Sequence, residues 1–381
     1  MPKIVTRFFF YKISYFVARM LSFFYRGLGR RGNEKIIIFR PDAIGDYLLF
    51  QNFIPLVKKD NVEIILVGNS KWMELAGVNE SFTYESIDRV KFSRDFFYRV
   101  KFLLNASCYS NVQAVLYPCY SREGVVFEDF VRIISSSRKV AWFGDTVNHS
   151  KISRYFTSKI YTDLYSDSKK DCIVFEFYRN RMFFSSFLGK DINIDKPTIS
   201  FTPSYNMKLP EKYALLFIGA STSIRKWSPS GFSETASYLK NKFGLDIVLC
   251  GGQDDVLEGE LISDSIKGTH LNLVGKTTQL ELLEIISSSV ILISNETAIP
   301  HIAMALDHPN VFVIYNGSHY GRFVPYPENF KNYHLITHPS IHADLNSYKI
   351  NSNKRGFNDN PNINDISSSD VISIIESKVS L

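Results

Sequence analysis

Residues 35–46 read KIIIFRPDAIGD, an apolar run that ends in a turn containing proline, glycine and two aspartates. The run at 35–39 is typical of a strand buried on both faces of a parallel sheet. Residues 47–57 (YLLFQNFIPLV) then have helical spacing, and apolar runs follow at 62–67 (VEIILV) and 113–117 (QAVLY). Strand, helix and strand at this spacing predict a βαβ unit, with its loops at the carboxyl edge of the sheet.

A second series of the same kind fills the C-terminal half. Strands are predicted at 213–218, 246–250, 290–293 and 311–314, and helices at 232–242, 280–287 and 298–306. The residues between the two series, 188–212, are polar and contain prolines, which is typical of an interdomain linker. We therefore predict the α/β fold class, with two Rossmann-like, doubly wound domains that face a ligand-binding central cleft.

The length and composition agree with two folded domains. The chain of 381 residues is too long for one ordinary core, and its 45% apolar and 22% charged residues predict a soluble globular protein. The four cysteines are widely spaced without a C-x-x-C pair, which is typical of reduced thiols in the cytoplasm and predicts no zinc site. The predicted parts are an N-terminal segment at 1–33, domains at 34–195 and 205–345, and a polar loop with a C-terminal helix at 346–381.

The positive charge of the chain is concentrated at its N-terminus. Residues 1–40 contain nine basic residues against one acid, which leaves a net charge of −2 for the rest of a chain whose total is +6. A protein that binds nucleic acid usually carries its basic face on the folded domain itself. We therefore do not expect nucleic acid as a partner.

The N-terminal segment combines these charges with many aromatic residues. Lys12, Arg19 and Arg26 interrupt the apolar stretch that a transmembrane helix would need, and no clear signal-peptide pattern is present. A basic amphipathic helix at the membrane surface, formed by residues 1–31, fits the pattern better. This predicts a cytoplasmic protein held at the inner face of the cytoplasmic membrane. The alternative is a helix packed on the protein, with its arginines simply solvated.

The first candidate site is the junction that ends in Gly45 and Asp46. The glycine allows a tight turn, and Asp46 then lies in the first turn of a helix at the edge of the predicted cleft. A single carboxylate can act as the general base that takes a proton from a hydroxyl group. The structural alternative is that Asp46 only complements the dipole of its helix.

Two more junctions follow strands of the second series. Residues 219–229 (GASTSIRKWSP) begin with small residues, Gly219, Ala220 and Ser221, whose backbone N–H groups can approach phosphate oxygens. Lys226 adds a positive charge to this loop, although an ordinary loop with a solvated basic pair would look the same.

The third junction is residues 294–301 (SNETAIPH), where small residues open a helix whose N–H groups can bind a diphosphate. Glu296 is a candidate acceptor of hydrogen bonds from sugar or ribose hydroxyls, and Thr297 and Ala298 belong to the same turn. His301 lies one turn into the helix, where it is as easily a satisfied core histidine as a ligand.

Five motifs in this order and spacing resemble glycosyltransferase family 9, the ADP-heptose:lipopolysaccharide heptosyltransferases. The motifs are RPDAIGDYLL at 40–49, GAS at 219–221 with RKWSP at 225–229, LCGGQDD at 249–255, LVGKTT at 273–278 and ISNETAIPH at 293–301. The resemblance implies a GT-B architecture, with an acceptor-binding N-terminal domain and a C-terminal domain that binds a nucleotide-sugar. It also implies an inverting transfer without metal or other cofactor to a lipopolysaccharide-type or other glycolipid or oligosaccharide acceptor.

By the same resemblance Asp46 is the base, Lys226 a phosphate contact, and Glu296, Thr297 and Ala298 part of the donor site. The chain departs from the family where Glu296 and Ala298 replace a frequent Asp and Gly, so ADP-heptose is one donor among several to consider. A sugar-nucleotide epimerase of the same architecture and a non-catalytic glycan-binding member are the alternatives to a transferase.

Overall fold

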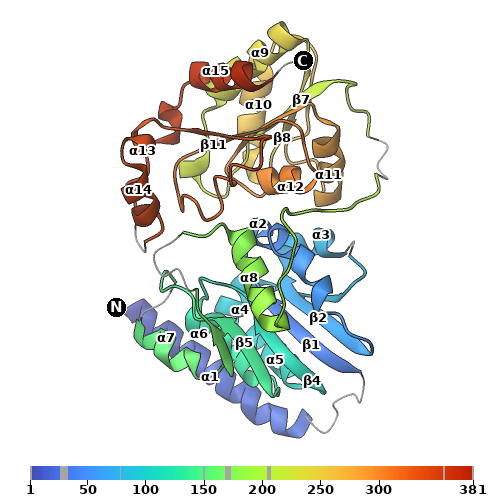
Figure 1. The fold of residues 1–381 in the computed structure, drawn as a ribbon, viewed down its shortest axis with the longest axis vertical. Helices are drawn as coiled ribbons and strands as arrows, with labels where there is room; N and C mark the ends of the chain where they lie inside the picture. The colour runs from blue at the N-terminus through green and yellow to red at the C-terminus, as the bar shows by residue number, and fades with distance from the viewer. Residues whose placement is uncertain are drawn as a thin grey trace. The chain divides into compact units, whose positions relative to one another are not determined.

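The computed structural model describes residues 2–25, 33–77, 79–148, 151–167, 173–203, 207–354 and 357–379 (Figure 1). The chain divides into two compact units. Residues Met1–Cys172 and Arg179–Asn193 form the N-terminal unit, and residues Ile173–Tyr178 and Ile194–Leu381 form the C-terminal unit. Each unit contains one six-stranded sheet, so the predicted α/β class with two doubly wound domains is confirmed.

The sheet of the N-terminal unit is entirely parallel and has the order β3-β2-β1-β4-β5-β6. Its strands are β1 (Glu34–Arg40), β2 (Val62–Asn69), β3 (Thr83–Ile87), β4 (Val112–Tyr117), β5 (Arg138–Trp142) and β6 (Asp163–Tyr165). Five consecutive residues of β1, from Ile36 onward, are buried, as the apolar run predicts. The strand order reverses between β1 and β4, which makes the loops after these two strands a topological switch point.

The described residues of this part of the chain form eight α-helices. They are α1 (Pro2–Tyr25), α2 (Ile44–Leu48), α3 (Met73–Gly77), α4 (Arg89–Arg94), α5 (Phe96–Ser107), α6 (Gly124–Ile133), α7 (Lys151–Ser158) and α8 (Glu176–Leu188). The helix predicted at 47–57 is wrong in its length: α2 ends at Leu48, and two 3-10 turns follow at Gln51–Phe53 and Pro55–Val57. The side-chain Nδ2 of Asn180 donates a hydrogen bond to the carbonyl of Leu49 at 3.0 Å. In addition, Pro55 has no N–H group to continue a helix.

Helix α1 packs along α5 and α6 (Figure 1). Its inward stripe of Tyr11, Ser14, Ala18 and Ser22 is buried, so the helix is part of the folded unit, as the structural alternative expects. Arg26, Arg30 and Arg31 lie outside the described residues. None of the helices in the described part of the chain has the length and hydropathy needed to cross a bilayer.

The C-terminal unit repeats the topology of the first. Its parallel sheet has the order β12-β11-β10-β7-β8-β9, so its switch point lies between β7 and β10. The strands are β7 (Tyr213–Phe217), β8 (Asp246–Cys250), β9 (His270–Asn272), β10 (Ile291–Asn295), β11 (Val311–Tyr315) and β12 (Tyr333–Thr337). The helices are α9 (Pro229–Phe243), α10 (Val256–Ser265), α11 (Gln279–Ser288), α12 (Ile299–Ala305), α13 (Ser340–Ala343), α14 (Leu345–Ser352) and α15 (Ser368–Lys378).

Local sequence signals explain the ends of two of these helices. Ser228 accepts a hydrogen bond from the N–H of Gly231 at 3.1 Å and caps α9, which ends at Gly244 in the left-handed conformation. Ser367 caps α15 in a reciprocal arrangement with Asp370.

Candidate functional site

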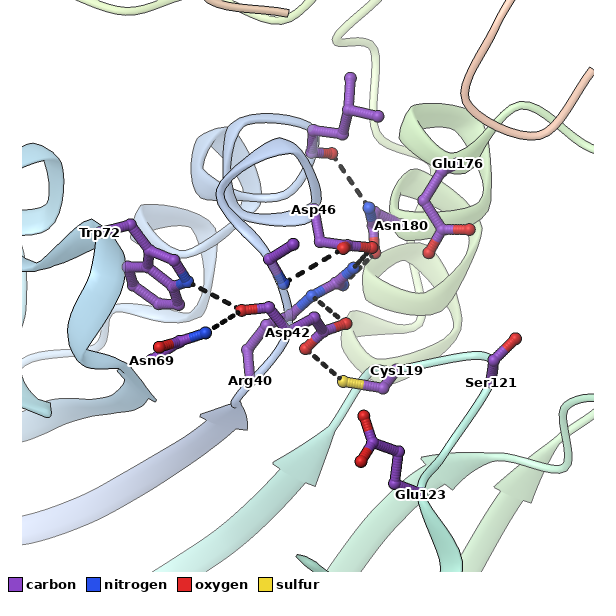
Figure 2. A network of polar contacts seen from close by, with 12 residues as sticks. Arg40, Asp42, Asp46, Asn69, Trp72, Cys119, Ser121, Glu123, Glu176 and Asn180 are labelled. Carbon is purple, nitrogen blue, oxygen red and sulfur yellow. Dashed lines mark hydrogen bonds and ion pairs between the residues drawn. The ribbon is translucent and has the colours of Figure 1, made fainter. Parts of the chain in front are cut away.

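The carboxylate of Asp46 lies at the switch point of the N-terminal unit, in the first turn of α2 (Figure 2). One oxygen, Oδ2, accepts a hydrogen bond from the N–H of Ala43 at 3.3 Å. The other, Oδ1, lies 3.5 Å from Nη2 of Arg40. The side chain of Asp46 is 16% exposed. The loop and the arginine therefore orient the carboxylate without covering it.

Arg40, the last residue of β1, is fully buried. Its Nε lies 3.3 Å from Oδ2 of Asp42, and its Nη1 donates to Oδ1 of Asn180 on α8 at 2.7 Å. The guanidinium also lies over the ring of Phe50, 4.9 Å from its centre. A buried arginine needs counter-charges and hydrogen bonds to offset its desolvation, and these neighbours supply them. Arg40 is thereby fixed beneath Asp46.

Asp42 connects this loop to the neighbouring strands (Figure 2). Its backbone carbonyl accepts hydrogen bonds from Nδ2 of Asn69 at 3.0 Å and from Nε1 of Trp72 at 3.1 Å. Its Oδ1 accepts one from the thiol of Cys119, beyond β4, at 2.9 Å. Burial and the nearby Asp42 carboxylate hold the pKa of the Cys119 thiol well above its usual range. Cys119 is therefore a neutral donor that supports the loop, and it is not an activated nucleophile.

In the C-terminal unit, the loop after β7 contains, near its start, the small residues Gly219, Ala220 and Ser221. Gly219 is buried, Ala220 is half-buried and Ser221 is exposed. A Cβ at position 219 would lie 2.3 Å from Oδ2 of Asp255, so only glycine fits without displacing that carboxylate. The same oxygen of Asp255 accepts the N–H of Gly252 at 2.8 Å, a contact within the loop after β8.

Lys226 is held by acids in this structure. Its Nζ lies 2.6 Å from Oδ1 of Asp255 and 3.1 Å from Oε1 of Glu258. Partial burial opposes the charge of Lys226, but hydrogen bonds and charge from the two acids outweigh it and raise the pKa of the ammonium. A phosphate group that binds Lys226 must therefore compete with two carboxylates that already bind it.

The loops after β7 and β10 are joined by a residue that the sequence did not single out. The buried side chain of Asn295 donates to the carbonyl of Ile218 at 2.7 Å and accepts the N–H of Trp227 at 3.0 Å. Next to it, Oε2 of the buried Glu296 lies 2.8 Å from Nη1 of Arg225. Burial raises the pKa of Glu296, and the charge of Arg225 opposes that rise. Both loops thus meet at the switch point of this unit.

The remaining predicted donor residues lie at the start of α12. Thr297 accepts the N–H of Ile299 at 3.2 Å, and Ala298 precedes the helix without a side-chain cap. His301 is buried, with its Nδ1 2.9 Å from the hydroxyl of Tyr326. Burial lowers the pKa of His301 to about 4, so the imidazole is neutral near pH 7. In this structure it is a satisfied core histidine.

The structure thus brings the predicted residues together in two groups, one in each unit. Sequence reasoning missed the residues that fix them, which are Arg40, Asp42, Asn180, Arg225, Asp255 and Asn295. Arg40 and Asp42 lie inside the quoted motif, but Asn180 is 140 residues from Arg40 and no local pattern indicates the contact. Within the described residues, His, Cys, Asp and Glu side chains form no group of three or more that could hold a metal ion.

Comparison with known proteins gives a family match over part of the chain. Residues 179–349 match the model of glycosyltransferase family 9 (heptosyltransferase). The segment around Asp46 lies outside that match. No curated protein sequence is a significant match to the chain.

Solved structures share the fold over nearly the whole chain. A glycosyl transferase family 9 protein from Veillonella parvula has a TM-score of 0.67 and 15% identity, over 91% of this chain and 98% of its own. The E. coli heptosyltransferase WaaC with ADP has a TM-score of 0.66 and 13% identity, over 91% and 100%. The E. coli ADP-heptose lps heptosyltransferase II has a TM-score of 0.62 and 15% identity, over 90% and 98%.

At these identities the structural likeness shows the fold, and the prediction of a GT-B architecture is confirmed. The family match covers both donor-side loops described above. The chain is a heptosyltransferase-like glycosyltransferase of the GT-B fold, related to glycosyltransferase family 9 through residues 179–349.

Proposed function

We propose that this glycosyltransferase moves a sugar from a nucleoside-diphosphate donor to a lipopolysaccharide-type or other surface-glycan acceptor. The transfer inverts the configuration at the sugar carbon and needs no metal ion. ADP-heptose is the first donor to test, because the matching family is described as heptosyltransferase and the WaaC structure contains ADP. The replacement of Asp and Gly by Glu296 and Ala298 makes other donors worth testing beside it.

The observation that carries the proposal is the orientation of Asp46. Its carboxylate is partly exposed, its Oδ1 faces Arg40, and its Oδ2 accepts the N–H of Ala43. A carboxylate has about four acceptor positions, so these contacts are compatible with a further hydrogen bond from an acceptor hydroxyl. Asp46 would take the proton of that hydroxyl as its oxygen attacks the sugar carbon, which is general-base catalysis.

The loops after β7 and β10 are the proposed donor site. Lys226 and the backbone of Gly219, Ala220 and Ser221 would contact the diphosphate, and their charge and N–H groups would stabilise it as it leaves. Glu296, Thr297 and Ala298 would contact the sugar or ribose. His301 would contribute by packing under these residues, since its imidazole is buried against Tyr326.

The proposed location is the cytoplasm, at the inner face of the cytoplasmic membrane. The acceptor of a surface-glycan transferase is usually attached to a lipid, and the N-terminal segment at 1–31 combines basic and aromatic residues suited to that surface. Nucleic acid is not a proposed partner, because the charge outside this segment is slightly negative.

A panel of nucleotide-sugars tests the proposal directly. Purified protein is incubated in EDTA with each donor and with a water-soluble saccharide acceptor, and release of nucleoside diphosphate and the anomeric configuration of the product are measured. We expect turnover with one donor, an inverted product, and a raised melting temperature with its nucleoside diphosphate; a ligand at 100 times its Kd adds about 2.7 kcal/mol.

Other outcomes identify the alternatives. Strict dependence on Mg²⁺ or Mn²⁺ contradicts the metal-free mechanism. Conversion of a donor into its epimer without transfer indicates a sugar-nucleotide epimerase. Nucleotide binding without turnover of any donor and acceptor pair indicates a non-catalytic glycan-binding protein.

A further inference from the structure

Helix α1 has two faces of opposite character. Its inward stripe is made of small and polar residues packed on α5 and α6. Its outward face is almost wholly apolar, and each of the following side chains is about half exposed or more: Phe8, Phe9, Ile13, Phe16, Met20, Phe23 and Phe24. Soluble proteins rarely leave a row of large apolar side chains in water, so this face is expected to be covered.

The inward face is fixed to the unit by a buried arginine. Arg99 of α5 donates from Nε to Oγ of Ser14 at 3.0 Å, and its Nη2 lies 2.8 Å from Oδ2 of Asp129. Its guanidinium also lies over the ring of Tyr11, 4.8 Å from the centre. Removing α1 would deprive Arg99 of its contacts with Ser14 and Tyr11. The helix is therefore packed in a fixed position on the N-terminal unit.

The charges on α1 itself are all positive. Arg7 and Lys12 are exposed and Arg19 is half-buried, whereas residues 2–25 contain no acid. The apolar surface also extends to α5, because Phe10 contacts Phe96 at 6.1 Å between ring centres and Phe96 contacts Phe97 at 5.7 Å. Phe97 is 82% exposed. An occupant of this face must accept aromatic side chains and carry negative charge.

We propose that the outward face of α1, together with Phe97, docks onto an anionic lipid leaflet with the helix lying in the headgroup layer. The helix has 24 residues and is about 36 Å long, so several aromatic side chains can enter the boundary between headgroups and acyl chains at once. Arg7, Lys12 and Arg19 contact the anionic headgroups. Because α1 is fixed through Arg99, docking also sets the orientation of the unit that carries Asp46.

Flotation of the full-length protein with lipid vesicles tests this inference. The vesicles contain phosphatidylethanolamine with about one quarter phosphatidylglycerol, and vesicles of phosphatidylcholine serve as the neutral comparison. The apolar variant is Phe16→Ser/Phe23→Ser/Phe24→Ser, and the charge variant is Lys12→Gln/Arg19→Gln. The matched control is Leu257→Ser/Leu261→Ser, which removes two exposed leucines of α10 in the other unit.

We expect the apolar variant to lose at least about tenfold in vesicle partitioning at any salt concentration, because the loss of apolar burial is not screened. The charge variant should lose about fivefold per residue on anionic vesicles and little on neutral ones. High salt should release part of the parent protein, and the control variant should float like the parent. Circular dichroism melting checks that each variant is folded.

Two results overturn the inference. One is an apolar variant that floats like the parent protein. The other is a parent protein that forms a dimer lost in the apolar variant, which would identify a second copy as the occupant. The inference rests on the proposed function only for the lipid-linked acceptor, so transfer to a soluble acceptor is measured in parallel. Vesicle binding without any sugar transfer would reject the proposed function and leave the docking face intact.

Discussion

The two units have the same strand order, yet their switch points expose opposite charges. In the N-terminal unit the arginine is fully buried, and its partner Asp46 is the member of the pair that remains 16% exposed. In the C-terminal unit the acid is the buried member: Asp255 is 7% exposed, and its partner Lys226 is 23% exposed. The same topology thus leaves an acid partly exposed in one unit and a cation partly exposed in the other.

The difference teaches that burial decides which member of an ion pair can react. The buried member is locked by further contacts, as Arg40 is by Asn180 and Asp255 is by the N–H of Gly252. The exposed member keeps access to solvent and to a ligand. A carboxylate held in this way suits proton transfer, and an ammonium held in this way suits a diphosphate.

The largest expected effect is the loss of the base. Asp46→Asn keeps an oxygen that can accept the N–H of Ala43 but cannot take a proton from a hydroxyl. We expect the rate of sugar transfer to fall about 100- to 10,000-fold, with nucleotide affinity unchanged and the protein still folded, because Asp42 and Asn180 keep their contacts with Arg40. Asp88→Asn is the matched control, because Asp88 is an aspartate at the start of another helix, α4, in the same unit. Near-parent turnover of Asp46→Asn would reject the assignment of the base.

The two units should also differ in their response to acid. Burial lowers the pKa of both His301 and His308 in the C-terminal unit to about 4, against 6.5 in an unfolded chain. Between these two pH values the unfolded chain binds more protons than the folded chain. The contribution of the two neutral histidines to folding stability is therefore fully present above about pH 6.5 and is lost as the pH falls towards 4. The loss is roughly 3 kcal/mol for each histidine.

Hydrogen exchange of amides in β10 and β11, measured from pH 7 to 4, checks this prediction after correction for intrinsic rates. His301→Gln should remove about half of the added loss of protection, since one of the two buried imidazoles is gone. His342→Gln, at an exposed histidine, is the control and should follow the parent. Equal pH slopes for the parent and His301→Gln would contradict the neutral, buried state of this histidine.

A smaller effect is expected for the exposed cation of the C-terminal unit. Lys226→Ala should weaken binding of the nucleoside diphosphate by roughly ten- to a hundredfold, because a charge-assisted contact is worth about 1.5–3 kcal/mol. Ala298→Phe should weaken it too, by filling the same turn. Isothermal calorimetry measures both, with Lys242→Ala on the exposed surface of α9 as the control. Unchanged affinity in both variants would show that the diphosphate binds elsewhere.

The smallest effect has the opposite sign and sharpens the comparison most. Glu258→Gln removes one of the two acids that hold Lys226, while Asp255 and its contacts stay in place. Competition for the ammonium then falls, and nucleoside diphosphate affinity should rise about two- to fivefold, as expected for one partly exposed ion pair. Glu260→Gln, an exposed acid on the same helix, is the control in the same titration. Weaker binding of Glu258→Gln would mean that the acid takes part in the donor site itself.

Sequence patterns predicted the fold because its central elements are locally determined. The apolar runs of β1 and β8 each depend on neighbouring residues, and both strands are found where the pattern indicates. The helix at 47–57 was wrong because the contact at Leu49 comes from Asn180, far along the chain. The periodicity of apolar residues in the sequence gives no sign of such a distant contact.

The candidate site follows the same division. The loop residues from Gly219 to Lys226 could be found from small residues after a strand, and the structure brings them to the switch point. The acids that bind Lys226 could not be found, because Asp255 and Glu258 belong to another loop and the next helix. For α1, the helix follows from the sequence, but its buried side depends on Arg99 of a different helix.

The crowding at Gly219 gives this position an influence that its lack of a side chain conceals. Any methyl group there would push away Oδ2 of Asp255, whose other oxygen holds Lys226 at 2.6 Å. A displaced Asp255 would leave Glu258 to bind the ammonium and would lose the N–H of Gly252. Substitution at 219 would therefore change the electrostatics of the proposed donor site, and a screen for altered donor preference should include this position alongside the charged ones.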